Sequence, residues 1–229
     1  MFKRIVPFLI IVISILTPGC SSDLPPNVDQ VSFIRVSEDS DFVDNFSTEF
    51  TKVSGYFPDV TKTELTDNMC WAIAVANCLE NTGWVPDAYE VVVELQVEFG
   101  NQPHSTYAAL IWYFDTFFPN HDLLLYAAIE YDHNFIPEFI ASSIEFDRPV
   151  MLNMKDPDKS IGHAISIYGY KFVPETEYEG DSFIFLFTHG DDNVYSKQMQ
   201  VEWVNGEWYI ETTFPDYEMR SAINLRSED

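Results

Sequence analysis

The hydrophobic positions of the chain change from a helix-like to a strand-like pattern near residue 149. Before that point, residues 70–81 form an apolar, small-residue segment that follows a polar turn, and Gly83 comes soon after it. An apolar segment between a polar turn and a glycine is typical of a buried helix with a polar N-cap. Three other segments predict further helices, at 86–99, 105–118 and 134–146.

After residue 149 the chain consists of short apolar runs separated by Asp, Pro and Gly turns, which predicts strands. Asn205 and Gly206 separate two of these runs and predict a tight hairpin turn. Helices followed by strands indicate an α+β fold, with a helical lobe ahead of an antiparallel β lobe. The expected strands cover 150–154, 164–170, 182–188, 197–204 and 207–210.

The N-terminal residues have the pattern of a bacterial export signal. Lys3 and Arg4 precede the apolar run 5–16, which is too short for a stable membrane span. Residues 1–19 are therefore expected to be a signal peptide, excluded from the fold. Cys20 follows and resembles the lipidated cysteine of a cell-envelope lipoprotein; an ordinary cleaved signal and a secreted protein are the alternative.

Residues 20–45 mix Pro, Ser and acidic residues around one short apolar patch at 31–36. This composition predicts a tether to a lipid anchor at Cys20, in which the patch could form an edge strand. Residues 46–229 are expected to form one domain, because the mature chain is long enough for one substantial core but not for two independent domains.

The net charge of −25, from 37 acidic and 12 basic residues, argues against nucleic acid as a partner. Binding to phosphates requires basic patches. The acidic surface suits a protein that stays soluble outside the cell, with the membrane reached only through a lipid anchor. The aromatic residues, 16% of the chain, are expected to fill the core.

Cys70 lies in the first turn of the expected 70–81 helix. The N–H groups of a helix N-terminus favour a thiolate and stabilise an oxyanion beside it. Taken alone, however, a cysteine before an alanine-rich helix is more often a packing residue. Cys78 lies eight residues further on, about 12 Å along the same helix, so it cannot form a disulfide with Cys70 and is expected to fill the core.

His163 is the candidate base, since it opens a predicted strand and can face a cleft. Catalytic Cys/His pairs are usually far apart in sequence, so Cys70 and His163 together favour catalysis over packing. The histidines His104, His121 and His133 lie in polar loops without metal-ligand spacing and are expected at the surface. No metal or cofactor is expected.

The order of these features resembles the papain-like cysteine peptidases, and among them the immunoglobulin-degrading cysteine endopeptidases of streptococci. The likeness in arrangement covers about residues 53–210. Three motifs carry it: Gly55-Tyr-Phe-Pro-Asp-Val-Thr-Lys-Thr63 before the cysteine, Gly162-His-Ala164 followed by Tyr168-Gly169, and Phe187-Thr188 before an acidic turn.

The resemblance implies a papain-like, two-lobed fold and a cysteine endopeptidase. Cys70 would be the nucleophile, and His163 its ion-pair partner and general acid. The oxyanion hole would combine the backbone N–H of Cys70 with Lys62, which matches a lysine of the family. The segment from Lys62 to Cys70 is about two residues shorter than in the family, and a solvated surface lysine is the alternative.

The third catalytic position departs from the family pattern. The family has Asp or Asn just after the strand that here ends at Thr188, where this chain has His189. Asp191 matches the second aspartate of the family's acidic turn, so either Asp191 or His189 would orient His163. Residues 190–193 also fit a plain turn or a weak calcium loop.

The sequence therefore predicts a secreted, lipid-anchored cysteine endopeptidase that cleaves an extracellular protein. The resemblance makes host immunoglobulin-like proteins one candidate substrate, although motifs around a catalytic site do not carry substrate specificity. Two alternatives remain open. They are a catalytically weak papain-like binding module, and a thiol enzyme that transfers acyl or amide groups, since fold and Cys/His pair do not separate hydrolysis from transfer.

Overall fold

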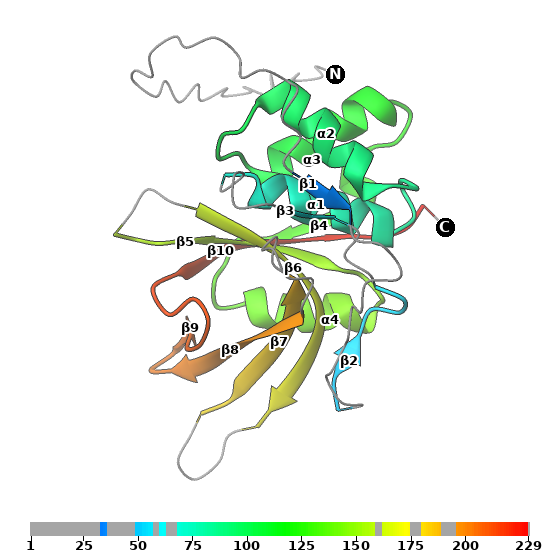
Figure 1. Ribbon diagram of the computed structural model, residues 1–229. Helices are drawn as coiled ribbons and strands as arrows, with labels where there is room; N and C mark the ends of the chain where they lie inside the picture. Colours follow the sequence, from blue (N-terminus) through cyan, green and yellow to red (C-terminus); the bar gives the residue numbers. More distant parts are fainter. Residues whose placement is uncertain are drawn as a thin grey trace, which may run out of the picture.

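The computed structural model describes residues 33–35, 49–56, 60–62, 68–158, 162–174, 180–188 and 196–228. Over these ranges the chain forms four α-helices and an eight-stranded antiparallel sheet (Figure 1). The α+β class expected from the sequence is confirmed. In the same ranges, no helix combines the length and the apolar character needed to cross a membrane. The helices are α1 (Cys70–Asn81), α2 (Ala88–Phe99), α3 (Thr106–Phe117) and α4 (Ile136–Glu145).

The large sheet has the strand order β4-β10-β5-β6-β7-β8-β9, and the short β2 pairs with β6. Two more strands, β1 (Phe33–Arg35) and β3 (Val60–Lys62), form a separate antiparallel pair. The strands of the large sheet are β2 (Thr51–Lys52), β4 (Ala127–Glu130), β5 (Val150–Lys155), β6 (Gly162–Val173), β7 (Ser182–Thr188), β8 (Ser196–Val204), β9 (Glu207–Ile210) and β10 (Glu218–Leu225).

The central strands are buried on both faces, because helices cover both faces of the sheet. Helices α1 to α3 lie on one side of β5 and β10 and α4 on the other (Figure 1). Side chains alternate between the faces. Met151 and Ala164 belong to the hydrophobic cluster under α1 to α3, whereas their chain neighbours Leu152 and Ile165 belong to the cluster with α4. The sheet therefore separates two hydrophobic clusters, one on each of its faces.

Helix α1 is enclosed by the helical layer and the sheet. Every residue from Cys70 to Leu79 is buried, and the helix packs against α2, α3, β5 and β6. Its alanines allow the sheet to approach closely. Ser166 of β6 donates a hydrogen bond of 3.4 Å to the carbonyl oxygen of Ala74. This packing fixes the position of Cys70 at the start of the helix.

Most predicted elements agree with the structure to within two residues. Strands β7 and β9 have the predicted bounds, and β6 extends the expected strand at both ends. Helices α2 and α3 begin later than expected because Asp87 and Ser105 are N-caps, whose side chains accept from backbone N–H groups. Asn205 and Gly206 have φ values of 54° and 92°, as a two-residue hairpin turn requires, so the predicted hairpin is confirmed.

Three strands of the sheet were not predicted from the sequence: the two-residue β2, β4, and β10, which lies between β4 and β5. The register of β10 against β5 shifts between Met219 and Ser221, and this bulge breaks the alternation that identifies a strand. Strand β4, with the sequence Ala-Ala-Ile-Glu, is short and lacks the β-branched residues that favour strands.

Candidate functional site

A cavity of about 690 Å³ has both Cys70 and His163 in its wall. Cys70 is the first residue of α1 and His163 the second residue of β6, so 93 positions separate them along the chain. The contact between α1 and β6 brings the two segments together. The two residues selected from the sequence thus lie at one cavity.

Cys70 is the first residue of α1, and 8% of it is exposed to solvent. The expected polar N-cap is wrong, because Met69 occupies that position and makes no side-chain cap hydrogen bond. The carbonyl oxygen of Met69 accepts hydrogen bonds from the backbone N–H groups of Ala72 and Ile73, at 3.0 and 3.2 Å. The N–H groups that donate within the helix therefore start after Cys70. With no side-chain cap there, the partial positive charge of the helix end acts at the thiol.

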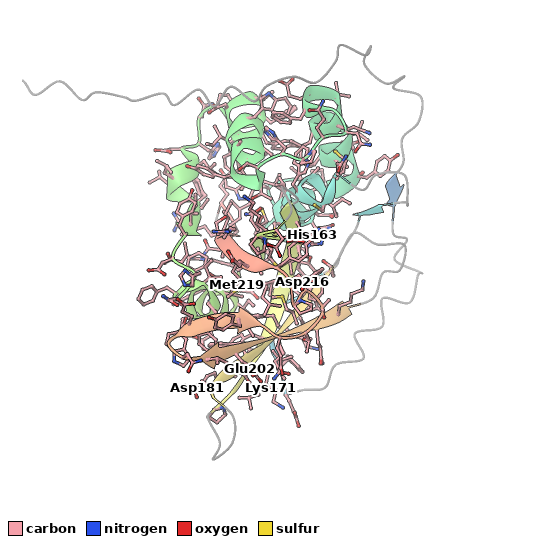
Figure 2. All side chains as sticks on the ribbon, turned by 90° about the vertical axis from the view of Figure 1, so that its left-hand side faces the viewer. His163, Lys171, Asp181, Glu202, Asp216 and Met219 are labelled. Atoms are coloured by element: carbon pink, nitrogen blue, oxygen red, sulfur yellow. The ribbon has the colours of Figure 1, made fainter. Side chains whose placement is uncertain are left out.

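His163 is half-buried, and aromatic rings contact its imidazole. The ring centroids of Phe214 and Tyr217 lie 5.2 and 6.3 Å from that of His163. Both rings come from the segment before β10. In Figure 2, His163 lies at the level where the helices meet the sheet, above Asp216 and Met219. The imidazole is therefore positioned by the β10 side of the sheet as well as by its own strand.

The third catalytic position lies beyond the described part of β7. That strand ends at Thr188, which pairs with Ser166 of β6. Both His189 and Asp191 are outside the described residues, so the choice between them stays a prediction. Cys20 is likewise outside them.

Lys62 ends strand β3, and only its backbone is described. Strand β3 packs against α1, the helix that begins at Cys70. The segment expected to supply an oxyanion donor therefore lies beside the helix that carries the thiol. The role of the Lys62 side chain stays a prediction.

One side of the cavity is aromatic. Trp71 donates from Nε1 to the carbonyl oxygen of Gln102 at 2.9 Å, which fixes the indole ring. The ring of His104 stacks on Phe99, with centroids 4.2 Å apart and planes 26° apart, and burial lowers its pKa. His104 is exposed, as the sequence predicts, but it also lines the cavity, which the sequence does not show.

A polar network forms another part of the wall. The amide nitrogen of Asn153 lies 2.9 Å from the Thr106 hydroxyl and 3.1 Å from the Ser221 hydroxyl. These three residues come from β5, α3 and β10, and the network ties these elements together beside the cavity. The sequence carries no signal for it, because short polar residues in separate elements form no motif.

The second thiol has a different environment. Cys78 is fully buried in the cluster under α1 to α3, and burial raises its pKa to about 12. A thiol with so high a pKa is protonated and inert at neutral pH. The expectation that Cys78 fills the core is confirmed.

Among the described residues, no group of three or more His, Cys, Asp and Glu side chains could hold a metal ion. The chemical groups at the cavity are thus a thiol at a helix start, imidazoles, an aromatic wall, hydroxyl and amide groups, and the side chains of Lys155 and Arg220. Comparison with models of known protein families gives no match, and comparison with curated proteins gives no match either. Function has to be inferred from the cavity itself.

Proposed function

We propose that this protein is an exported cysteine endopeptidase with a papain-like, two-lobed architecture. The observation that carries this proposal is the shared cavity of Cys70 and His163. A thiol at a helix N-terminus needs a base in the same cavity to act as a nucleophile, and His163 is the second residue of a strand that packs on that helix.

The order of the elements supports the papain-like architecture. The helix with the thiol belongs to the α1 to α3 group, which precedes the main sheet strands, and the histidine lies on a central antiparallel strand. The resemblance predicts this order. The helical side would supply Cys70 and the sheet side His163, with substrate bound between them.

The proposed reaction needs no group beyond water. The thiolate of Cys70 adds to the carbonyl carbon of a peptide bond, and His163 donates its proton to the nitrogen as the C–N bond breaks. The amine product leaves, and a thioester remains on Cys70. Water then attacks the thioester carbon and gives a proton to His163, and the C–S bond breaks to release a carboxylic acid and the thiolate.

The oxyanion formed in each step needs donors beside Cys70. The backbone N–H of Cys70 belongs to the first turn of α1, before the first N–H groups that donate to carbonyl oxygens within the helix. Lys62 is the proposed second donor, and the packing of β3 against α1 supports this role. One such donor typically contributes about 100- to 1000-fold to the rate.

Asp191 is the proposed orienting group for His163. Thr188 pairs with Ser166 in the antiparallel ladder. Asp191 lies three positions after Thr188, and His163 lies three positions before Ser166. This equal spacing in an antiparallel pair supports a carboxylate next to the imidazole, where it would stabilise the imidazolium of the ion pair. His189 is the alternative.

The export signal and Cys20 support action outside the cell on an extracellular protein substrate, with a lipid anchor as the proposed attachment. A binding module is the second candidate function, and His189 in the place of the family's Asp or Asn favours it. The two candidates differ in one measurable property, since only the peptidase needs a reactive Cys70.

Iodoacetamide labelling of the folded protein at neutral pH, followed by mass spectrometry of the peptides, tests the proposal. Cys70 should be alkylated fast and Cys78 only on unfolding, because one thiol lines the cavity and the other is fully buried with a raised pKa. Wild-type protein should also cleave a broad peptide panel, with Cys70→Ala as the inactive baseline. A Cys70 that labels no faster than Cys78 would overturn the enzyme proposal, whereas fast labelling without cleavage would favour acyl or amide transfer.

A further inference from the structure

Among the described residues, the formal charge that lines the cavity is opposite in sign to the net charge of the protein. The chain has 37 acidic and 12 basic residues, so a random stretch of its surface is strongly negative. Among the described residues that line the cavity, Lys155 and Arg220 are the formally charged ones, and none is Asp or Glu. Local charge of one sign inside a cleft raises the concentration of oppositely charged ligands there.

The strand register explains why Lys155 faces this cavity. Met154 points into the cluster with α4, so its neighbours Asn153 and Lys155 point to the opposite face of the sheet. Asn153 bonds to Thr106 of α3 on that face, which identifies it as the helical side. Lys155 pairs with Gly162 and His163 with Met154, so the two side chains start from opposite faces of the sheet, and both line the cavity.

Arg220 reaches the cavity through the irregularity in β10. The register shifts between Met219 and Ser221, so Arg220 is the extra residue of a bulge. Met219 packs with the α4 cluster, whereas Ser221 bonds to Asn153 on the helical side. Arg220 thus lies between a residue that faces the α4 side and a residue that faces the helical side. Its side chain lines the cavity.

The carboxylate of Glu218 lies near both cations but can neutralise only one of them. Glu218 is the register partner of Lys155, and its Oε2 lies 2.6 Å from Nη2 of Arg220. The side chains of this pair are 54% and 51% exposed, so solvent screens it and a ligand can compete for the arginine. No ion pair joins Lys155 to any residue in the described ranges.

We infer that the cavity selects substrates with an acidic side chain close to the reacting carbonyl, held by Lys155 and Arg220. This inference rests on the proposed function. The aromatic wall of Trp71 and His104 supplies the apolar part of the recognition surface, and the two cations supply its charge. The acidic surface of the protein would repel an acidic peptide, whereas the two cations of the cavity would attract it. Charge would therefore favour binding of such a peptide next to Cys70.

Charge selection can be measured on the thiol alone, before any substrate is known. Iodoacetate and iodoacetamide alkylate a cysteine by the same displacement of iodide, but only iodoacetate carries a negative charge. In wild-type protein at low salt, the rate ratio of iodoacetate to iodoacetamide at Cys70 should exceed that of a free cysteine peptide by about fivefold. The ratio should fall towards that of the peptide in 1 M NaCl, where the Debye length is about 3 Å.

Variants with matched charge changes locate the effect. Lys155→Gln should lower the ratio clearly below that of wild type. Lys171→Gln removes the same charge from the far end of the sheet, about 26 Å along β6 from His163, and should leave the ratio as in wild type (Figure 2). Glu218→Gln releases Arg220 and should raise the ratio.

The outcomes separate this inference from the function on which it rests. A Cys70 that reacts fast with iodoacetamide, but whose iodoacetate ratio is unaffected by Lys155→Gln and by Glu218→Gln, overturns the charge selection and leaves the thiol enzyme intact. A Cys70 inert to both reagents overturns the proposed function, and the inference with it. If cleavage is seen, paired Glu and Gln peptides should differ at least about fivefold in kcat/KM, and the difference should shrink in Lys155→Gln, where Arg220 remains.

Discussion

The hydroxyl of Tyr56 lies 2.9 Å from the hydroxyl of Thr188 inside the core, although 132 positions separate the two residues. The Tyr56 ring also stacks on Tyr168, with centroids 4.6 Å apart and planes 5° apart. Burial raises the pKa of Tyr56 well above its ordinary value, so the phenol stays neutral at physiological pH. Tyr56 therefore joins the chain just before β3 to the end of β7, the two segments that lead to Lys62 and Asp191.

Removing the Tyr56 hydroxyl should weaken this junction. Tyr56→Phe keeps the ring stack but leaves the buried Thr188 hydroxyl without this partner, which should cost about 1–3 kcal/mol in the free energy of unfolding. Peptidase kcat should fall more than KM changes, because the segments at the site lose their support. Urea titration and steady-state kinetics measure the two effects.

The matched control is Tyr209→Phe, which removes an exposed hydroxyl that donates to Glu207 and should change stability by less than about 0.5 kcal/mol. Combining Tyr56→Phe with Thr188→Val gives a double-mutant cycle. The two changes should be clearly non-additive, and strict additivity would mean that the hydroxyl contact contributes nothing.

Alanine substitutions decide the third catalytic position. If Asp191 orients His163, Asp191→Ala should lower kcat/KM by at least about 100-fold, because the imidazolium loses its charge partner, while His189→Ala has a small effect. If His189 has that role, the order reverses. Rates for both variants are compared with Cys70→Ala, and equal small effects would remove both residues from the mechanism.

Cys20 should carry a lipid when the protein is expressed in a bacterium with the lipoprotein pathway. Cys20→Ser should then lose the incorporation of labelled fatty acid and be released from the membrane fraction. Gel fluorography of metabolically labelled cells measures this directly. Equal labelling of wild type and variant would instead identify a simple cleaved signal.

The stack of His104 on Phe99 should make stability depend on pH. Burial lowers the pKa of His104 below its ordinary value of 6.5, so the folded state binds this proton less readily than the unfolded state. The resulting contribution is present above about pH 6.5 and is lost as the pH falls through the lowered pKa of the folded state. His104→Gln should remove this part of the pH dependence of unfolding, and NMR titration of the His104 ring should report a pKa below 6.5.

Local physical chemistry determined much of the secondary structure from the sequence alone. The buried α1, the strands β7 and β9, and the Asn205-Gly206 turn depend on side-chain period and on backbone preferences within a few residues. Cys70 and His163 were identifiable for the same reason, because a helix start and a strand start are local features. The different environments of the two cysteines, one at the cavity and one in the core, also followed from their positions in the helix.

Tertiary structure decided what depends on contacts between distant segments. Strand β10 owes its interior place in the sheet to pairing with both β4 and β5, and its bulge interrupts the alternation by which a strand is predicted from sequence. The same bulge places Arg220 in the cavity wall, on the strand next to the one that carries Lys155. Neither the positive charge at this cavity nor the network at Asn153 can be derived from sequence, because each is a sum over side chains that only pairing of distant strands and packing of helices bring together.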